Sequence, residues 1–215
     1  MRELSNRARK IRNRVILTTL LAFFIGYVSN SQHQSDLAVI KARGELVMLT
    51  LPGPTTFFED GQGKNGFDYL LAKAFADSLG VELVVKPMPT VRSLLLSVGG
   101  PQGDFAAANL VKTELRDKSL RFTTPYLEVT QQLIYRRGSP RPKSIDQLDG
   151  ELVIISDSSH SENLQKLKLD YPALAWREQD NADMSDLIRQ IHEGEISYSV
   201  ADSLVYLISR HIYPK

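Results

Sequence analysis

The stretch GDFAAANLVKTELRDKSLRFTTPY, residues 103–126, decides the fold of this chain. Its first part, DFAAANL at 104–110, is a short apolar run of the kind that forms a strand inside a sheet. Two strand–helix pairs precede that run, and a second set of alternating strands and helices follows the stretch. This alternation predicts an α/β protein built from βαβ units.

The first half of the chain is expected to run strand, helix, strand, helix, strand. Residues 45–51 (ELVMLTL) form an apolar run that ends at a Pro-Gly-Pro turn, which indicates a buried strand. A helix is expected over 68–79, a strand over 81–85 and a further helix after Thr90, its N-cap. The apolar residues that share one face of the first helix are Leu71, Ala72, Phe75 and Leu79.

The second half repeats the alternation around a linker. Residues 138–143 (GSPRPK) have the proline and glycine content of a hinge. Strands are expected over 128–136, 151–156, 174–177 and 196–201, and helices over 161–169, 184–192 and from 203 onward. We therefore expect two lobes, lobe one over 44–136 and lobe two over 137–215, with a ligand cleft between them at the strand ends.

Composition excludes several kinds of site. Hydrophobic residues at 42% and charged residues at 24% are typical of an ordinary folded protein, and the absence of cysteine excludes disulfides and thiolate chemistry. Residues 59–60 and 180–183 are expected in solvated turns. No carboxylate pair, Ser/His/Asp set or phosphate-binding loop stands out, so we predict no catalytic residue, metal or cofactor. The histidines lack metal-ligand spacing and are expected at the surface: His33, His160, His192 and His211.

The net charge of +1 hides an uneven distribution. Residues 1–14 carry six basic side chains and one acid, a local charge of +5 that leaves −4 for the rest of the chain. A mildly acidic body lacks the basic face that neutralises phosphate groups. No nucleic-acid partner is therefore expected.

The basic segment leads directly into an uncharged run of 14 residues, VILTTLLAFFIGYV at 15–28. The two together match the charged and apolar regions of a secretory signal. The run is shorter than the about 20 apolar residues that span a bilayer comfortably. We interpret residues 1–30 as a signal peptide or an uncleaved membrane anchor. Either one places the body in the periplasm of a Gram-negative envelope, associated with the membrane.

Five short motifs resemble the signature of the family 3 extracellular solute-binding proteins. They are GFD at 66–68, LA at 71–72, GDF at 103–105, TELR at 113–116 and FTTPY at 122–126. Their spacing carries the resemblance, because an arginine six residues before a Phe-Ser/Thr-x-Pro-Tyr element and three after a threonine is seldom accidental. The resemblance implies a two-lobed, periplasmic-binding-protein-like fold of type II that binds amino acids and similar solutes.

Two further stretches, QQLIY at 131–135 and YSVADS at 198–203, are similar to the N-terminal domain of membrane-bound lytic murein transglycosylases. That likeness implies a regulatory module in cell-wall turnover, with a possible catalytic domain further downstream. The family's return crossover from lobe two to lobe one is expected beyond residue 215, so lobe two is expected to be incomplete. The alternatives are a stand-alone amino-acid-binding component of an ABC uptake system and a dehydratase built on the same fold.

The resemblance implies a ligand site with opposite charges on the two lobes. Arg116 matches the arginine that clamps a ligand carboxylate, a task suited to the paired N–H groups of a guanidinium, although it is also compatible with a surface turn. Asp202 matches the acid that holds a ligand ammonium, or else it caps the following helix. Ser158 and Ser159 match a turn at a helix N-terminus that attracts anions. The implied ligand is a zwitterionic solute, an amino acid or a muropeptide.

Three weaker candidates and two departures from the family pattern complete the site. Thr113 contacts the ligand or caps its own turn, Asn109 offers an amide to the cleft or closes a turn, and Phe57 forms an aromatic wall or packs inward. Asp157 replaces a family glycine and brings an acid to the expected anion site, and Val111 replaces a frequent hydroxyl residue. These departures disfavour a simple carboxylate on lobe two and suggest a less polar or modified solute.

Overall fold

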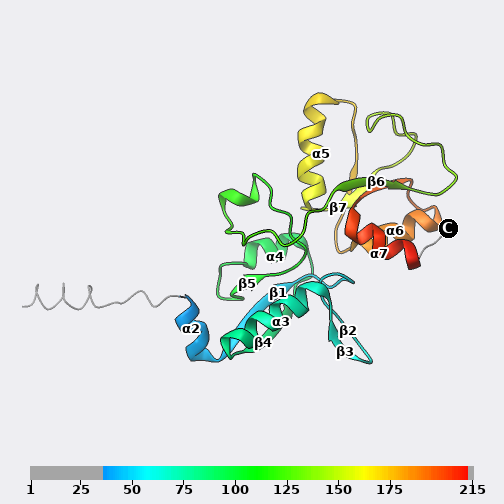
Figure 1. The fold of residues 1–215 in the computed structure, drawn as a ribbon. Helices are drawn as coiled ribbons and strands as arrows, with labels where there is room; N and C mark the ends of the chain where they lie inside the picture. Colours follow the sequence, from blue (N-terminus) through cyan, green and yellow to red (C-terminus); the bar gives the residue numbers. More distant parts are fainter. Residues whose placement is uncertain (1–35, 213–215) are drawn as a thin grey trace, which may run out of the picture. The chain divides into compact units, whose positions relative to one another are not determined.

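The computed structural model describes residues 36–212, with side chains over 36–209, so the expected signal or anchor at 1–30 lies outside the described residues. Within the described part, no helix is long and apolar enough to cross a membrane. Gly44–Lys215 form one compact unit, whose described residues run from light blue to red in Figure 1. A short helix, α2 (Asp36–Arg43), belongs to the unit that precedes it.

The first half of the compact unit builds a parallel sheet in the order β4-β1-β5. The central strand β1 (Glu45–Thr50) pairs along its whole length with β4 (Glu82–Pro87) and at two positions with β5 (Phe105–Ala106). All of β1 after its first residue is buried, as expected for a central parallel strand covered on both faces. The apolar run at 104–110 therefore contributes a much shorter strand than the sequence indicates.

Two helices accompany this sheet. α3 (Phe67–Leu79) contacts β1 and β4, and α4 (Val91–Ser97) begins at the expected cap, Thr90, and packs its Leu94 into the core (Figure 1). The inner face of α3 differs from the expected one, because small side chains at 72 and 76 let the helix approach the sheet closely. Leu71 and Phe75 lie outside that contact and are 48% and 50% exposed.

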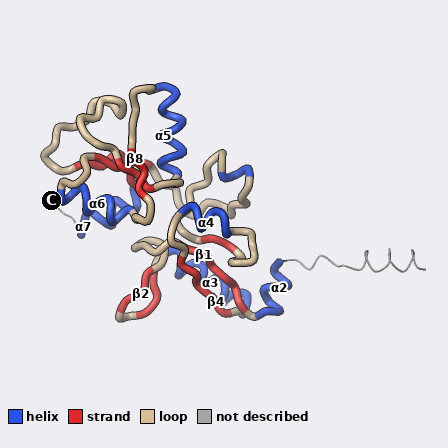
Figure 2. The backbone as a smooth tube through the Cα atoms, turned by 180° about the vertical axis from the view of Figure 1, so that it is seen from behind, coloured by secondary structure: helices blue, strands red, loops and turns tan. Residues whose placement is uncertain are grey.

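A hairpin that the sequence does not indicate follows β1. It consists of β2 (Phe58–Asp60) and β3 (Gly63–Asn65), and it is visible as the red loop of tube labelled β2 in Figure 2. The solvated turn expected at 59–60 is therefore wrong, because both residues lie in a strand. An exposed two-stranded ribbon needs no apolar alternation, so it leaves no periodic signal in the sequence.

The second half builds two strand pairs. β6 (Gln131–Tyr135) runs antiparallel to β9 (Tyr198–Asp202), and β7 (Val153–Ile155) runs parallel to β8 (Arg177–Gln179). A single parallel bridge from the residue before β7 to the start of β9 joins the pairs. The strand expected at 174–177 forms slightly later, because the backbone N–H of buried Leu174 bonds to the carbonyl oxygen of Tyr171 and closes a turn.

Helices cover both faces of these strands. Val153 of β7 packs in a cluster with residues of α6 (Met184–Glu193) and α7 (Ser203–Ile212), whereas Ile154 packs in a cluster with α5 (Ser159–Asp170). Because successive strand residues point to opposite faces, α5 covers one face and α6 and α7 the other (Figure 1). The expected turn at 180–183 ends in Asp183, the N-cap of α6.

The register places β6 with the second set of strands, although residues 128–136 fall within the expected lobe one. β6 pairs with β9, which is far away in the sequence, so the proline and glycine content at 138–143 does not indicate to which set of strands β6 belongs. We propose the two-lobed division with its boundary ahead of β6.

Candidate ligand-binding site

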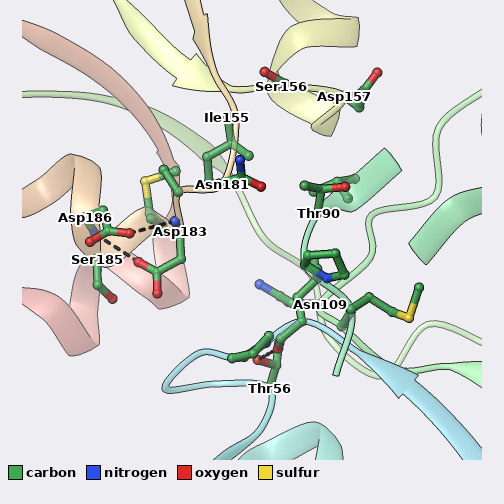
Figure 3. A pocket seen from close by; sticks show the side chains of 18 of the residues that line it. Thr56, Thr90, Asn109, Ile155, Ser156, Asp157, Asn181, Asp183, Ser185 and Asp186 are labelled. Atoms are coloured by element: carbon green, nitrogen blue, oxygen red, sulfur yellow. Dashed lines mark hydrogen bonds between the residues drawn. The ribbon is translucent and has the colours of Figure 1, made fainter. Parts of the chain in front are cut away.

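A cavity of about 520 Å³ lies where strands of both halves end. Its lining residues follow β1, β4 and β5 on one side and β7 and β8 on the other. Open α/β sheets bind ligands at these carboxyl ends, and the volume suits a small molecule. In Figure 3 the amide of Asn109 extends toward the space, with Asp183 and Asp186 across from it.

The cavity wall carries more acid than base. Its charged residues are Asp157, Asp180, Asp183, Asp186 and Arg92. Asp183 and Asp186 form a capping box, each carboxylate accepting the other residue's backbone N–H at 2.9 and 3.1 Å. Arg92 donates two hydrogen bonds to Asp157, at 2.9 and 2.8 Å. The wall therefore has a net negative charge, which favours an ammonium group over an anion.

Arg116 does not line this cavity but bonds to one of its lining residues, Asp157, and it is buried, only 5% exposed. Its Nε donates to Oε1 of Glu162 at 2.8 Å, and its Nη2 donates to the carbonyl oxygen of Asp157 at 3.0 Å. Its Nη1 donates to the carbonyl oxygen of Val111 at 3.3 Å. The guanidinium is therefore part of the interior and not of a surface turn.

Thr113 shapes the turn that carries Arg116. Its Oγ1 accepts the backbone N–H of Arg116 at 3.2 Å, at the start of the short 3-10 helix η1 (Arg116–Lys118). This contact is the capping alternative that the sequence leaves open. The threonine positions the arginine and does not line the cavity.

Asp202 ends β9 and is paired within the protein. Its Oδ1 lies 3.2 Å from Nε2 of His160, and both residues are buried. The expectation of a surface His160 is therefore wrong, because the first turn of α5 lies in the interior. His192 is exposed as expected, whereas the side chains of His33 and His211 lie outside the described residues.

The two serines stand at the N-terminus of α5, as the resemblance implies. Ser158 is the N-cap, and its hydroxyl accepts the backbone N–H of Ser161 at 3.2 Å. The hydroxyl of Ser159 accepts a hydrogen bond from Gln131 of β6 at 3.2 Å. Both hydroxyl groups therefore have partners within the protein.

Asn109 and Phe57 have different positions. Asn109 lines the cavity in a left-handed backbone conformation, with φ of 52°. Its backbone N–H donates to Oδ2 of Asp68 at 2.6 Å. Phe57 is buried with its ring centroid 5.6 Å from that of Tyr69, so it packs inward and does not line the cavity.

Asp157 shows why a glycine suits its position. Its φ is 56°, a left-handed conformation that glycine adopts freely and that aspartate tolerates better than most residues. Its carboxylate points away from the cavity in Figure 3 and pairs with Arg92. The acid is therefore neutralised at this position, and only its backbone carbonyl reaches Arg116.

The structure gathers Arg116, Ser158, Ser159 and Asp202 around the first turn of α5, but the described residues show no hydrogen bond between Arg116 and Asp202. Their partners, Glu162 and His160, are two positions apart on the helix, which separates their directions by about 200°. Arg116 and Asp202 thus contact different sides of α5.

Glu162, His160 and the buried carboxylate of Asp68 are not marked as site residues by the sequence alone. An acid in the first turn of a helix is common, because it faces the positive end of the dipole, so Glu162 carries no special signal. Asp68 accepts the hydroxyl of Tyr126 at 2.6 Å. Burial raises the pKa of Asp68, and burial followed by the bond to Asp68 raises the pKa of Tyr126.

Comparison with known proteins gives the context of this site. The model of the family described as bacterial extracellular solute-binding proteins, family 3, matches residues 46–198. A membrane-bound lytic murein transglycosylase F of Saccharophagus degradans is 42% identical over 201 residues, 93% of this chain and 40% of that protein. Its counterpart in Cellvibrio japonicus is 41% identical over 180 residues, 83% of this chain and 36% of that protein. The chain thus spans about two fifths of the length of these relatives.

Solved structures show the same fold. An ancestral arginine-binding protein bound to arginine matches with a TM-score of 0.70 and 28% identity, over 80% of this chain and 76% of that one. The arginine-bound form of truncated ArgBP from T. maritima matches with a TM-score of 0.69 and 27% identity, over 82% of each chain. The expected periplasmic-binding-protein-like fold of type II is confirmed.

Proposed function

This chain belongs to the bacterial extracellular solute-binding proteins, family 3, and from that premise we propose that it binds a small zwitterionic solute, either an amino acid or a peptidoglycan-derived peptide. The observation that carries the proposal is the cavity of about 520 Å³ at the strand ends of both halves. Two structural neighbours are arginine-binding proteins, which supports a solute of this class.

In this proposal the carboxylate of the solute binds Arg116. The guanidinium donates a hydrogen bond to the backbone carbonyl oxygen of Asp157, and Asp157 is one of the residues that line the cavity. A buried guanidinium offers paired, charge-assisted hydrogen bonds that water screens little. Ser158 and Ser159 stand at the N-terminus of α5, where the backbone N–H groups of the helix add partial positive charge on the same side.

The ammonium group of the solute binds the acidic side of the site. Asp202 is its proposed partner, and the acid-rich cavity wall attracts the same charge. Asn109 contributes an amide that fixes orientation, whereas Thr113 and Phe57 support the turn and the core beside the site.

The proposed setting is the periplasm. Relatives over most of this chain are membrane-bound lytic murein transglycosylases, and the apolar run at 15–28 supplies a route across the inner membrane. We propose that the chain is the regulatory N-terminal part of such an enzyme. The solute would then report on cell-wall turnover to a catalytic domain.

Calorimetric titration of the purified chain with a panel of free amino acids and purified muropeptides tests the binding proposal. We expect saturable binding of at least one zwitterion. The matched amide, which lacks the carboxylate, and the matched deaminated acid should both bind more weakly. Absence of binding across the whole panel would contradict the proposal.

A further inference from the structure

Arg116, the proposed carboxylate clamp, already holds a carboxylate of this protein. Its Nε donates to Oε1 of Glu162 at 2.8 Å, and the two side chains are 5% and 13% exposed. A pair so withdrawn from water is little screened by salt, and its hydrogen bond is charge-assisted. Glu162 therefore already binds the guanidinium that the carboxylate of the solute is proposed to bind.

The pair connects two separate parts of the fold. Arg116 follows β5 of the first sheet, whereas Glu162 belongs to α5, which packs on β7. The Nη2 group of Arg116 adds a bond to the carbonyl oxygen of Asp157, two residues before α5. The contacts of Arg116 are thus among those that join these two parts, beside the pairs Arg92–Asp157 and Glu114–Lys166.

The pairing with Arg116 satisfies only one of the two carboxylate oxygens of Glu162. Its second oxygen, Oε2, is buried without a hydrogen-bond partner among the described residues. A buried oxygen without a donor is unfavourable, whereas a free carboxylate from solution can take two parallel N–H groups of a guanidinium. The internal pair is therefore one that a better carboxylate can displace.

We propose that Glu162 is an internal competitor for the solute carboxylate and so determines the specificity of the site. This inference rests on the proposed role of Arg116. In the empty protein Glu162 holds Arg116, and a solute carboxylate binds by displacing it. A solute whose only charged group is one carboxylate forms too few contacts in the site to displace Glu162. A solute with a second charged group gains further contacts at the acidic wall and succeeds.

The same helix turn holds the other proposed ligand group. Nε2 of His160 lies 3.2 Å from Oδ1 of Asp202, and Nδ1 of His160 is buried without a partner among the residues described. One turn of α5 thus engages both charges that the solute is proposed to use. Release of Arg116 by Glu162 is the step that the test addresses.

The test compares Glu162→Gln with Glu114→Gln by calorimetric titration against the amino-acid and muropeptide panel. Glu114 is a matched control, because it pairs with Lys166 of α5 at 2.9 Å but is exposed and forms no hydrogen bond with Arg116 among the described residues. Glu162→Gln should tighten zwitterion binding about tenfold or more, because the competent state no longer competes with an internal pair. Glu114→Gln should bind as the unchanged chain does.

Each outcome has a distinct meaning. Equal or weaker binding by Glu162→Gln, while the unchanged chain binds, would overturn internal competition and leave the proposed function intact. Absence of binding by all three proteins would remove the proposed function and the inference together. Urea unfolding shows whether Glu162→Gln folds. If it does not, Glu162→Asp keeps the charge on a shorter stem and should tighten binding to a smaller extent, and no tightening would overturn the proposal.

Discussion

Asp68 is a buried carboxylate that holds part of the cavity wall. It is 3% exposed, and its two oxygens accept the backbone N–H of Asn109 and the hydroxyl of Tyr126, both at 2.6 Å. Asn109 needs this bond because its left-handed backbone is outside the regular sheet ladder. Asp68 is therefore a positioning residue for Asn109.

Asp68→Asn should destabilise the protein by about 1–3 kcal/mol, because an amide leaves one of the two donors without an acceptor. Urea unfolding measures the change. Asp77→Asn is the control on the same helix, since the carboxylate of Asp77 is exposed and pairs with Lys73, and it should change stability by less than about 0.5 kcal/mol. Equal effects of the two substitutions would contradict the assigned role.

The effect of Asp68→Asn should also depend on pH. Burial raises the pKa of Asp68 above its ordinary 3.8, so the folded state holds this proton more tightly than the unfolded chain. The resulting stabilisation is complete below 3.8 and is lost as the pH rises through the folded-state pKa. The difference in unfolding free energy between the unchanged chain and Asp68→Asn should therefore become smaller from about pH 3 to about pH 7. A difference that stays constant over unfolding curves at these pH values would rule this out.

Single residues of the site were predictable only where a motif marks them. The TELR and YSVADS motifs locate Arg116 and Asp202, and both prove to be buried charged groups at strand or turn ends. Their partners Glu162 and His160 were not predictable. A pairing between segments 46 or 42 positions apart leaves no local pattern in one sequence.

At the scale of elements, Gly66 fixes the start of α3. Its φ is 123°, and a Cβ at this position would lie 2.3 Å from the carbonyl oxygen of Thr56. Gly80 ends the same helix with φ of 71° and open space around a Cβ. A Cβ at Gly66 would add a steric clash to the cost of the left-handed backbone, whereas a Cβ at Gly80 would add only the conformational cost.

Gly66→Ala should cost about 3 kcal/mol or more, because strain and a clash with rigid backbone add together. Gly80→Ala should cost only about 1 kcal/mol, the penalty for a left-handed residue with a Cβ. Midpoints of urea unfolding give both values. Similar costs would show that the approach of Gly66 to Thr56 is not a tight contact.

Helices and strands were predictable where burial of one face places apolar residues at regular intervals in the sequence. The apolar run of β1, the capped start of α4 and the helical pattern of α6 are readable, because burial and capping act locally. The β2–β3 hairpin is not, because it is exposed and polar. The inner face of α3 also escapes prediction, since two alanines rather than the large apolar residues face the sheet.

At the scale of the whole molecule, alternation and motif spacing predicted the fold, whereas the place of β6 depends on a pairing with β9 across 63 or more positions. The proposed periplasmic setting makes a prediction of its own. In cells that express the chain, protease added to spheroplasts should digest the body, because the basic residues at 1–14 stay in the cytoplasm. A body that is protected and recovered with the cytosol would contradict this placement.

The central claim is that Arg116 binds a solute carboxylate, and calorimetric titration of Arg116→Lys and Arg116→Ala with the best-bound zwitterion tests it most directly. Arg177→Ala is the control, because Arg177 is exposed and pairs with Glu151. Arg116→Ala should weaken binding by about 2–5 kcal/mol, the range for truncating one member of a buried charged pair. Arg116→Lys keeps the charge beside Glu162 but loses the paired N–H groups, so it should also weaken binding. Arg177→Ala should bind as the unchanged chain does, and unchanged affinity in both Arg116 variants would contradict the account.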